Sequence, residues 1–182
     1  QGFEVVLVEK NPQLGGLMRE LTDTIEGDDI QAHLSDVIAL VEQNANIQVL
    51  TESLIVDFKG FKGNFTTEIM VGPSMYQREI DHGIVILATG AQEYKPTEFL
   101  YGEDDRVITH LELDRRLYES GADDLERVVM VQCVGSRNEE NPNCSRICCQ
   151  SAIKNAIQIK KLNPETDVFI LYRDIRTYGR ME

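Results

Sequence analysis

The side chains of this sequence with the widest chemical range are its four cysteines, which lie close together. Ten residues separate Cys133 from Cys144, three separate Cys144 from Cys148, and Cys149 follows directly. A thiolate can bind a metal or attack a disulfide, and an unreactive thiol can be buried as a small apolar group. The cluster therefore predicts metal or redox chemistry, provided that the fold brings the sulfurs together.

The elements around the cysteines are expected to bring them together. RVVMVQC predicts a buried strand ending at Cys133, and CSRICCQSAIKNAIQIKKLN predicts a long helix that Cys144 opens. Cys148 would lie one turn later on the same face, with Cys149 about 100° further round. The loop between strand and helix can fold back and bring Cys133 opposite. Such a set of four sulfurs suits a [4Fe–4S] cluster, which four thiolates hold.

The local charge favours this assignment. A helix N-terminus stabilises an anion, and neighbouring positive side chains lower the pKa of a thiol. Arg137, Arg146 and Lys154 are positive residues near the cysteines in a chain of net charge −13. The cluster site is therefore expected to be locally electropositive.

Three other interpretations of the cysteines remain open. A structural zinc also uses thiolates, but two adjacent ligands are awkward for a rigid tetrahedral site. A redox disulfide could form between Cys144 and Cys148 or between Cys148 and Cys149. The thiols could also be buried and unreactive, because cysteine is among the most buried residue types.

A second group of residues indicates a dinucleotide site. GFEVVLVEK predicts a buried strand with Glu9 at its carboxyl end, where dinucleotide folds place the carboxylate that binds a ribose. The glycines of NPQLGG allow close approach of the backbone to a ligand, and IVILATGA predicts a second buried strand. The combination resembles the FAD-binding domain of the thioredoxin reductase class. That resemblance implies FAD contacts at Glu9, Lys10, Gly15, Gly16, Thr89 and Gly90.

The glycine fingerprint of that class, G-x-G-x-x-G, is absent from the 182 residues. It is expected upstream of Gln1, so the chain is interpreted as part of a larger protein. Alone, it would lack the phosphate cradle of the fingerprint, bind FAD weakly or not at all, and be inactive. NAD is not expected near the cysteines, because Arg173 stands where an acid would bind its ribose.

The order of the predicted elements indicates an α/β protein. We expect an incomplete Rossmann-like three-layer FAD/NAD(P)-binding fold over residues 1–91, with a helix within residues 27–46 and an antiparallel meander over residues 47–71. Residues 92–126 are interpreted as an acidic connector that contains a short helix. Residues 127–182 are expected to begin a second nucleotide-fold domain with a βαβ unit that includes the cysteines.

Composition limits the possible partners. The net charge of −13 and the pI near 4.6 argue against nucleic-acid binding, which needs clustered lysine and arginine. No apolar run is long enough to span a bilayer, and no signal peptide is visible. The low number of cysteines and the absence of a targeting segment favour a cytoplasmic location over a disulfide-stabilised secreted domain. None of the three histidines has a neighbour at a catalytic spacing, so no catalytic residue is assigned.

Three stretches together resemble one known family. VQCVGSRNEENPNCSRICCQSAIKNA, EKNPQLGGLM and VILATGAQEYKPTEFLYGEDDRVITHLEL are similar to the A-type subunit of heterodisulfide reductase, a family of flavin and iron–sulfur proteins. The resemblance implies an oxidoreductase component that transfers electrons between FAD and iron–sulfur clusters and that has other subunits of a complex as partners. The ferredoxin-type cysteine motifs of the family are absent, so any electron bifurcation stays unassigned.

Two other functions remain possible on sequence grounds. The chain could be a thiol–disulfide oxidoreductase that uses a cysteine pair, or a non-catalytic docking domain whose acidic connector binds a partner subunit.

Overall fold

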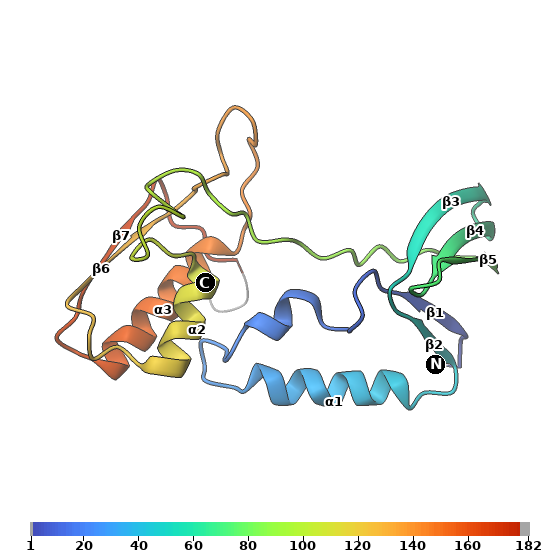
Figure 1. The fold of residues 1–182 in the computed structure, drawn as a ribbon, viewed down its shortest axis with the longest axis horizontal. Helices are drawn as coiled ribbons and strands as arrows, with labels where there is room; N and C mark the ends of the chain where they lie inside the picture. Colours follow the sequence, from blue (N-terminus) through green and yellow to red (C-terminus); the bar gives the residue numbers. More distant parts are fainter. Residues whose placement is uncertain (1, 179–182) are drawn as a thin grey trace. The chain divides into compact units, whose positions relative to one another are not determined.

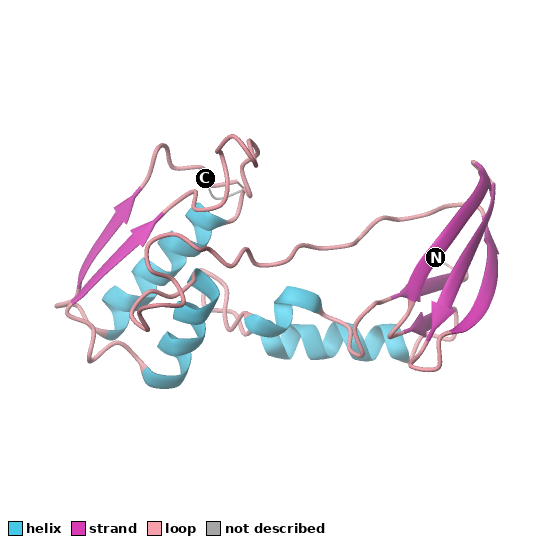
Figure 2. Ribbon diagram, turned by 45° about the horizontal axis from the view of Figure 1, so that its top comes forward, coloured by secondary structure: helices cyan, strands magenta, loops and turns pink. Residues whose placement is uncertain are grey.

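The computed structural model describes residues 2–178 and divides into two compact units. Unit 1 comprises Gln1–Arg19 and Ile30–Ala91, and unit 2 comprises Glu20–Asp29 and Gln92–Glu182. Figure 1 shows helices and strands in both units, and Figure 2 distinguishes them by colour. The predicted α/β class is confirmed.

Unit 1 contains a βαβ unit. Strands β1 (Val5–Val8) and β2 (Ile47–Leu50) pair in parallel, and helix α1 (Ile30–Glu42) connects them. A short 3₁₀-helix, η1 (Gly16–Glu20), precedes α1. The prediction that residues 47–50 belong to the meander was wrong. This short β-branched run pairs with a strand distant in the sequence, which its composition alone does not specify.

The rest of the sheet structure in unit 1 is an antiparallel meander that continues past the predicted end at residue 71, so its last strand was not predicted. It consists of β3 (Leu54–Phe61), β4 (Asn64–Val71) and β5 (Tyr76–His82), with β4 in the centre. Thr67, Ile69 and Val71 of β4 are buried on one face, as the alternation of side chains along a strand requires. Ile69 and Val71 form a core with Leu50 of β2.

The strand predicted over IVILATGA is not formed. Residues 84–90 follow β5 as an extended loop, and the exposed fractions of Ile84, Ile86 and Leu87 are 79%, 85% and 82%. A strand is stable only when neighbouring strands satisfy its backbone groups. Within residues 2–178 no strand pairs with this segment, which explains why its apolar sequence does not produce a strand here.

Unit 2 contains the second predicted βαβ unit. Strands β6 (Arg127–Val131) and β7 (Asp167–Leu171) pair in parallel, and helix α3 (Cys148–Leu162) connects them. Helix α2 (His110–Ser120) packs beside α3. The apolar core of unit 2 comes from both helices, from the loop after α2 and from β6, and its buried members are Leu113, Leu117, Ala122, Met130, Ala152 and Ile159.

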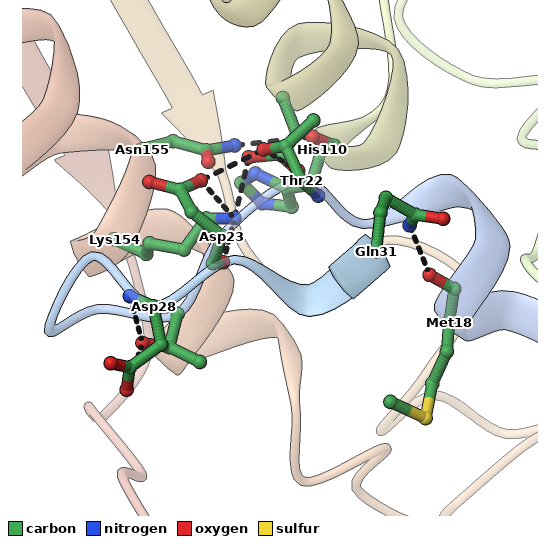
Figure 3. A network of polar contacts seen from close by, with 10 residues as sticks. Met18, Thr22, Asp23, Asp28, Gln31, His110, Lys154 and Asn155 are labelled. Carbon is green, nitrogen blue, oxygen red and sulfur yellow. Dashed lines mark hydrogen bonds and ion pairs between the residues drawn. The ribbon is translucent and has the colours of Figure 1, made fainter. Parts of the chain in front are cut away.

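A buried ion pair attaches residues 20–29 to the helices of unit 2. Lys154 Nζ of α3 lies 2.6 Å from Asp114 Oδ1 of α2, and only 15% and 2% of these two side chains are exposed. Asp114 Oδ2 accepts from Thr22 N and Thr22 Oγ1, and Lys154 Nζ donates to Asp23 O at 2.9 Å. Figure 3 shows Thr22, Asp23 and Lys154 converging at this point. The pair thus joins three segments that are distant in the sequence.

Helix α2 begins with a capping box. Thr109 Oγ1 accepts from Glu112 N, and Thr109 N donates to Glu112 Oε2. Partial burial opposes ionisation of this carboxyl, but hydrogen bonds from Thr109, Lys95 and Tyr101 lower the pKa of Glu112 to about 2. The ionised carboxylate at the helix start also complements the helix dipole. The box therefore fixes where α2 begins.

Replacing Thr109 with alanine is expected to lower the free energy of unfolding by about 1 kcal/mol, because Glu112 N loses its acceptor. The Thr109→Ser variant keeps the hydroxyl, so its stability should lie within about 0.5 kcal/mol of that of the parent chain. Urea unfolding followed by circular dichroism measures both values. Equal stabilities of the alanine and serine variants would contradict a role for the cap.

Candidate metal centre

The four cysteines line one small pocket in unit 2. The pocket lies where residues following β6, the turn before α3 and residues following β7 meet. The carboxyl ends of parallel strands are the usual ligand-binding edge of an α/β sheet. Besides the cysteines, the residues around the pocket include three arginines and one carboxylate: Arg137, Arg146, Arg176 and Asp174.

Cys133 enters the pocket two residues after the end of β6. The N–H of Gln132, the preceding residue, donates to Leu171 O of β7 at 2.9 Å, so the end of the strand pair fixes the chain at this point. Cys133 itself has a φ of 64°, in the left-handed region that side chains other than glycine rarely adopt. This conformation turns the chain away from the strand direction and into the loop.

The loop after Cys133 folds back on itself. Arg137 N donates to Asn143 O at 3.2 Å, and Asn141 Nδ2 donates to Gly135 O at 3.0 Å. Gly135 has a φ of 67°, and an added Cβ would lie 2.3 Å from the Tyr94 ring. Glycine is therefore required at this turn. The fold of the loop returns the chain to the pocket at Cys144.

Helix α3 begins at Cys148, four residues later than predicted. Cys144 lies in the preceding loop, so the prediction that it opens the helix with Cys148 one turn later was wrong. Arg146 has a φ of 66°, which is incompatible with a right-handed helix and ends any helical path from Cys144. Cys148 and Cys149 are consequently the first two residues of α3, and Cys149 is buried.

Three of the sulfurs have polar neighbours. Arg137 Nη1 donates to Cys133 Sγ at 3.8 Å, and Arg146 N donates to Cys144 Sγ at 3.4 Å. Ser145 Oγ lies 2.7 Å from Cys148 Sγ. In addition, the side chain of Ile147, the N-cap residue of α3, makes no capping hydrogen bond, and N–H groups at a helix start favour an anion. The surroundings of the pocket therefore place hydrogen-bond donors and positive side chains beside the sulfurs.

Asp174 and Arg176 are pocket residues that sequence reasoning missed. Asp174 accepts from Arg137 Nη1, and Arg176 Nε donates to Asp174 Oδ2 at 2.7 Å. The two arginines hold the pKa of Asp174 below its usual value. Their position just after β7 was the available indication, because that strand end shares an edge with Cys133. Lys154, expected to contribute charge to the site, instead pairs with Asp114.

The cysteines fit a cluster in the type and number of donors. All four are free thiols around one pocket, and four thiolates are the usual ligands of a [4Fe–4S] cluster. Within residues 2–178, no three His, Cys, Asp or Glu side chains are placed closely enough to hold a metal ion. The sulfurs would therefore have to turn toward a common centre to bind a cluster.

The predicted FAD contacts lie in unit 1. Glu9 and Lys10 follow β1, and Glu9 Oε1 accepts from Asn11 N at 2.7 Å. Gly15 and Gly16 have φ values of 115° and 49°, and the position of a Cβ on Gly16 has no atom within 4 Å. The turn after β1 thus leaves open backbone at Gly16. Thr89-Gly90 lies in the exposed loop after β5 instead of at the end of a strand.

Comparison with known proteins identifies similar sequences. The iron–sulfur A-type subunit of CoB–CoM heterodisulfide reductase from Methanocaldococcus jannaschii is 28% identical over 271 residues, covering 99% of this chain and 41% of that protein. The A-type subunit of the H₂:CoB–CoM heterodisulfide, ferredoxin reductase from Methanothermobacter thermautotrophicus is 43% identical over 118 residues, covering 56% of this chain and 18% of that protein. The chain thus spans less than half the length of these relatives.

Two other comparisons give less information. No family model matches the chain. The crystal structure of L-proline dehydrogenase from P. horikoshii is 17% identical, with a TM-score of 0.48, and the match covers 97% of this chain and 32% of that one. In the described residues, no helix combines the length and the apolar character needed to cross a membrane.

The similarity to the methanogen proteins extends over nearly the whole sequence and includes the segments with the cysteines and the glycine pair. The resemblance predicted from the sequence motifs is thereby confirmed, and the chain is similar to the A-type subunit of heterodisulfide reductase.

Proposed function

We propose that this chain is an electron-transfer component of a heterodisulfide reductase-like oxidoreductase, and that Cys133, Cys144, Cys148 and Cys149 bind a [4Fe–4S] cluster. The main support is that all four thiols line one pocket together with three arginines. One relative is named as an iron–sulfur subunit, which agrees with this assignment. Such a cluster would accept and release single electrons.

The residues of the pocket would stabilise the anionic form of the site. Arg137 and the backbone N–H of Arg146 donate to two of the sulfurs, and Arg176 adds a third positive charge. Hydrogen bonds to sulfur and the net charge around a cluster set its reduction potential. The chain would thus determine both the position of the cluster and its reduction potential.

The FAD site belongs to the same proposal. Glu9, Lys10, Gly15 and Gly16 would contact FAD at the turn after β1, where the backbone at Gly16 is open. Thr89 and Gly90 would join them when the segment after β5 forms a strand. The phosphate cradle would come from residues outside this chain, which spans 41% of the length of one relative.

The partners would be other subunits of an electron-transfer complex, as the subunit names of the relatives suggest. The acidic composition is compatible with docking to a basic surface. We propose a cytoplasmic location, on the basis of the free thiols.

Anaerobic reconstitution with iron and sulfide tests the cluster. We expect about four irons and about four sulfides per chain, with broad visible absorbance that bleaches on reduction. A chain with all four cysteines replaced by serine is the control and should stay colourless. Less than about one iron per chain would contradict the proposal. About one tightly bound zinc would support the structural-zinc alternative, and a gain of free thiols on reduction would support the disulfide alternative.

A further inference from the structure

Arg137 is held more firmly than an ordinary surface arginine. Its backbone N–H donates to Asn143 O, and its carbonyl accepts from Arg173 Nη1 at 2.6 Å. Its side chain is 19% exposed and donates to Asp174, which Arg176 also binds. The backbone of Arg137 is therefore held from two sides, and Asp174 holds its guanidinium.

The backbone of the pocket is strained at this residue. Arg137 has a φ of 57°, and Cys133 and Arg146, also at the pocket, have φ values of 64° and 66°. The left-handed conformation costs a side-chain-bearing residue about 1–2 kcal/mol. Strained conformations gather at sites where they aim a functional group. Here the strained conformation accompanies an Arg137 guanidinium directed at the sulfur of Cys133.

The contact between Arg137 and Cys133 is the reason to assign a function. Arg137 Nη1 lies 3.8 Å from Cys133 Sγ, within hydrogen-bond range for sulfur, while the same guanidinium is bound by Asp174. Reduction of a cluster adds one negative charge. A fixed positive charge beside one of its ligands favours the reduced form more than the oxidised form.

We propose that Arg137 is a positioning residue that holds a positive charge and an N–H donor against the Cys133 sulfur, and that it thereby raises the reduction potential of the cluster. This inference rests on the proposed function. Asp174 and Arg176 keep the guanidinium in place, so the charge stays at the sulfur instead of turning toward solvent.

A redox titration of the reconstituted chain with dithionite tests the role of Arg137. The Arg137→Met variant should bind the same amount of iron as the parent chain. At a fixed applied potential, its ratio of reduced to oxidised cluster should be about tenfold lower, a shift of about 59 mV for one electron. Arg137→Lys keeps the charge and should lower the ratio by less than about threefold.

Arg127→Met is the matched control, because it removes the same charge from the other end of β6. At about 3.3 Å per residue, Arg127 lies roughly 20 Å along the chain from Cys133, beyond the screening length of ordinary buffer. It should change the ratio by less than about twofold. An unchanged potential in Arg137→Met, or loss of its iron, would refute only the positioning role. A parent chain without iron would refute the proposed function and this inference together.

Discussion

Replacing Lys154 with methionine is expected to lower the free energy of unfolding of unit 2 by about 3–5 kcal/mol. The substitution keeps the length of the side chain but leaves the carboxylate of Asp114, 2% exposed, without the ammonium 2.6 Å away. Thr22 would remain as a hydrogen-bond donor to Asp114, but it supplies no charge. A buried charge that loses its counter-charge is far more costly than an intact pair is stabilising.

Urea unfolding followed by circular dichroism gives the size of the effect, and hydrogen exchange of peptides from α2 and α3 localises it to unit 2. Lys161→Met is the matched control, because Lys161 is exposed on the same helix. Its effect should stay within about 0.5 kcal/mol. Equal losses in the Lys154 and Lys161 variants would contradict the importance of the buried pair.

The double variant Asp114→Asn, Lys154→Met separates charge from packing. Asparagine keeps an acceptor for Thr22 but has no charge, so the double variant should recover at least half of the loss seen in Lys154→Met. A double variant as unstable as the single one would mean that the loss comes from side-chain packing and not from an unpaired buried charge.

Local sequence patterns were sufficient for much of this fold. Strands β6 and β7, most of the helix between them, α1 and the first two strands of the meander are predicted correctly. The predicted burial of β6 is wrong, because Val129 and Val131 are 53% and 36% exposed. Helix α2 was also predicted, and the capping box at Thr109 and Glu112 explains its start. In each case the information lies within one segment, as hydrophobic periodicity or as capping residues.

Features that depend on distant partners were not predictable in this way. Residues 84–90 have the composition of a buried strand but no strand to pair with in the described chain. Thr22 meets Asp114 across 92 positions of sequence, and nothing near Thr22 indicates that contact. The late start of α3 follows from the left-handed conformation of Arg146, which a residue of that type rarely adopts.

The candidate site, like the fold, was predictable only where the information lies within one segment of the sequence. The spacing of the cysteines indicated that they could share a site, and the structure brings them to one pocket. It does so by a different geometry, because Cys144 lies in the loop before α3 and not on the helix. Asp174 and Arg176 come from after β7 and complete the pocket. Their contribution depends on the pairing of two parallel strands and not on the cysteine motif.

Each single cysteine substitution is expected to reduce the affinity for the cluster at least about 100-fold. Loss of a group that only hydrogen-bonds to a metal ligand already lowers metal affinity about 10–100-fold, and loss of the ligand itself should cost more. Cys149 is the most informative position. It is the most buried of the four thiols and lies in the first turn of α3, so it could be a core residue instead of a ligand. If Cys149 is a ligand, replacing it with serine should abolish iron binding as completely as replacing Cys133 does.

Iron and sulfide content after anaerobic reconstitution measures this difference, and circular dichroism checks that each variant remains folded. Ser151→Ala is the control: Ser151 lies on the same helix and does not line the pocket, and its backbone N–H keeps the bond to Ile147 O when the hydroxyl is removed, so its iron content should equal that of the parent chain. A folded Cys149→Ser variant with full iron content would reduce the protein ligands to three. In that event the fourth iron would either take a ligand other than a cysteine or keep an open coordination position.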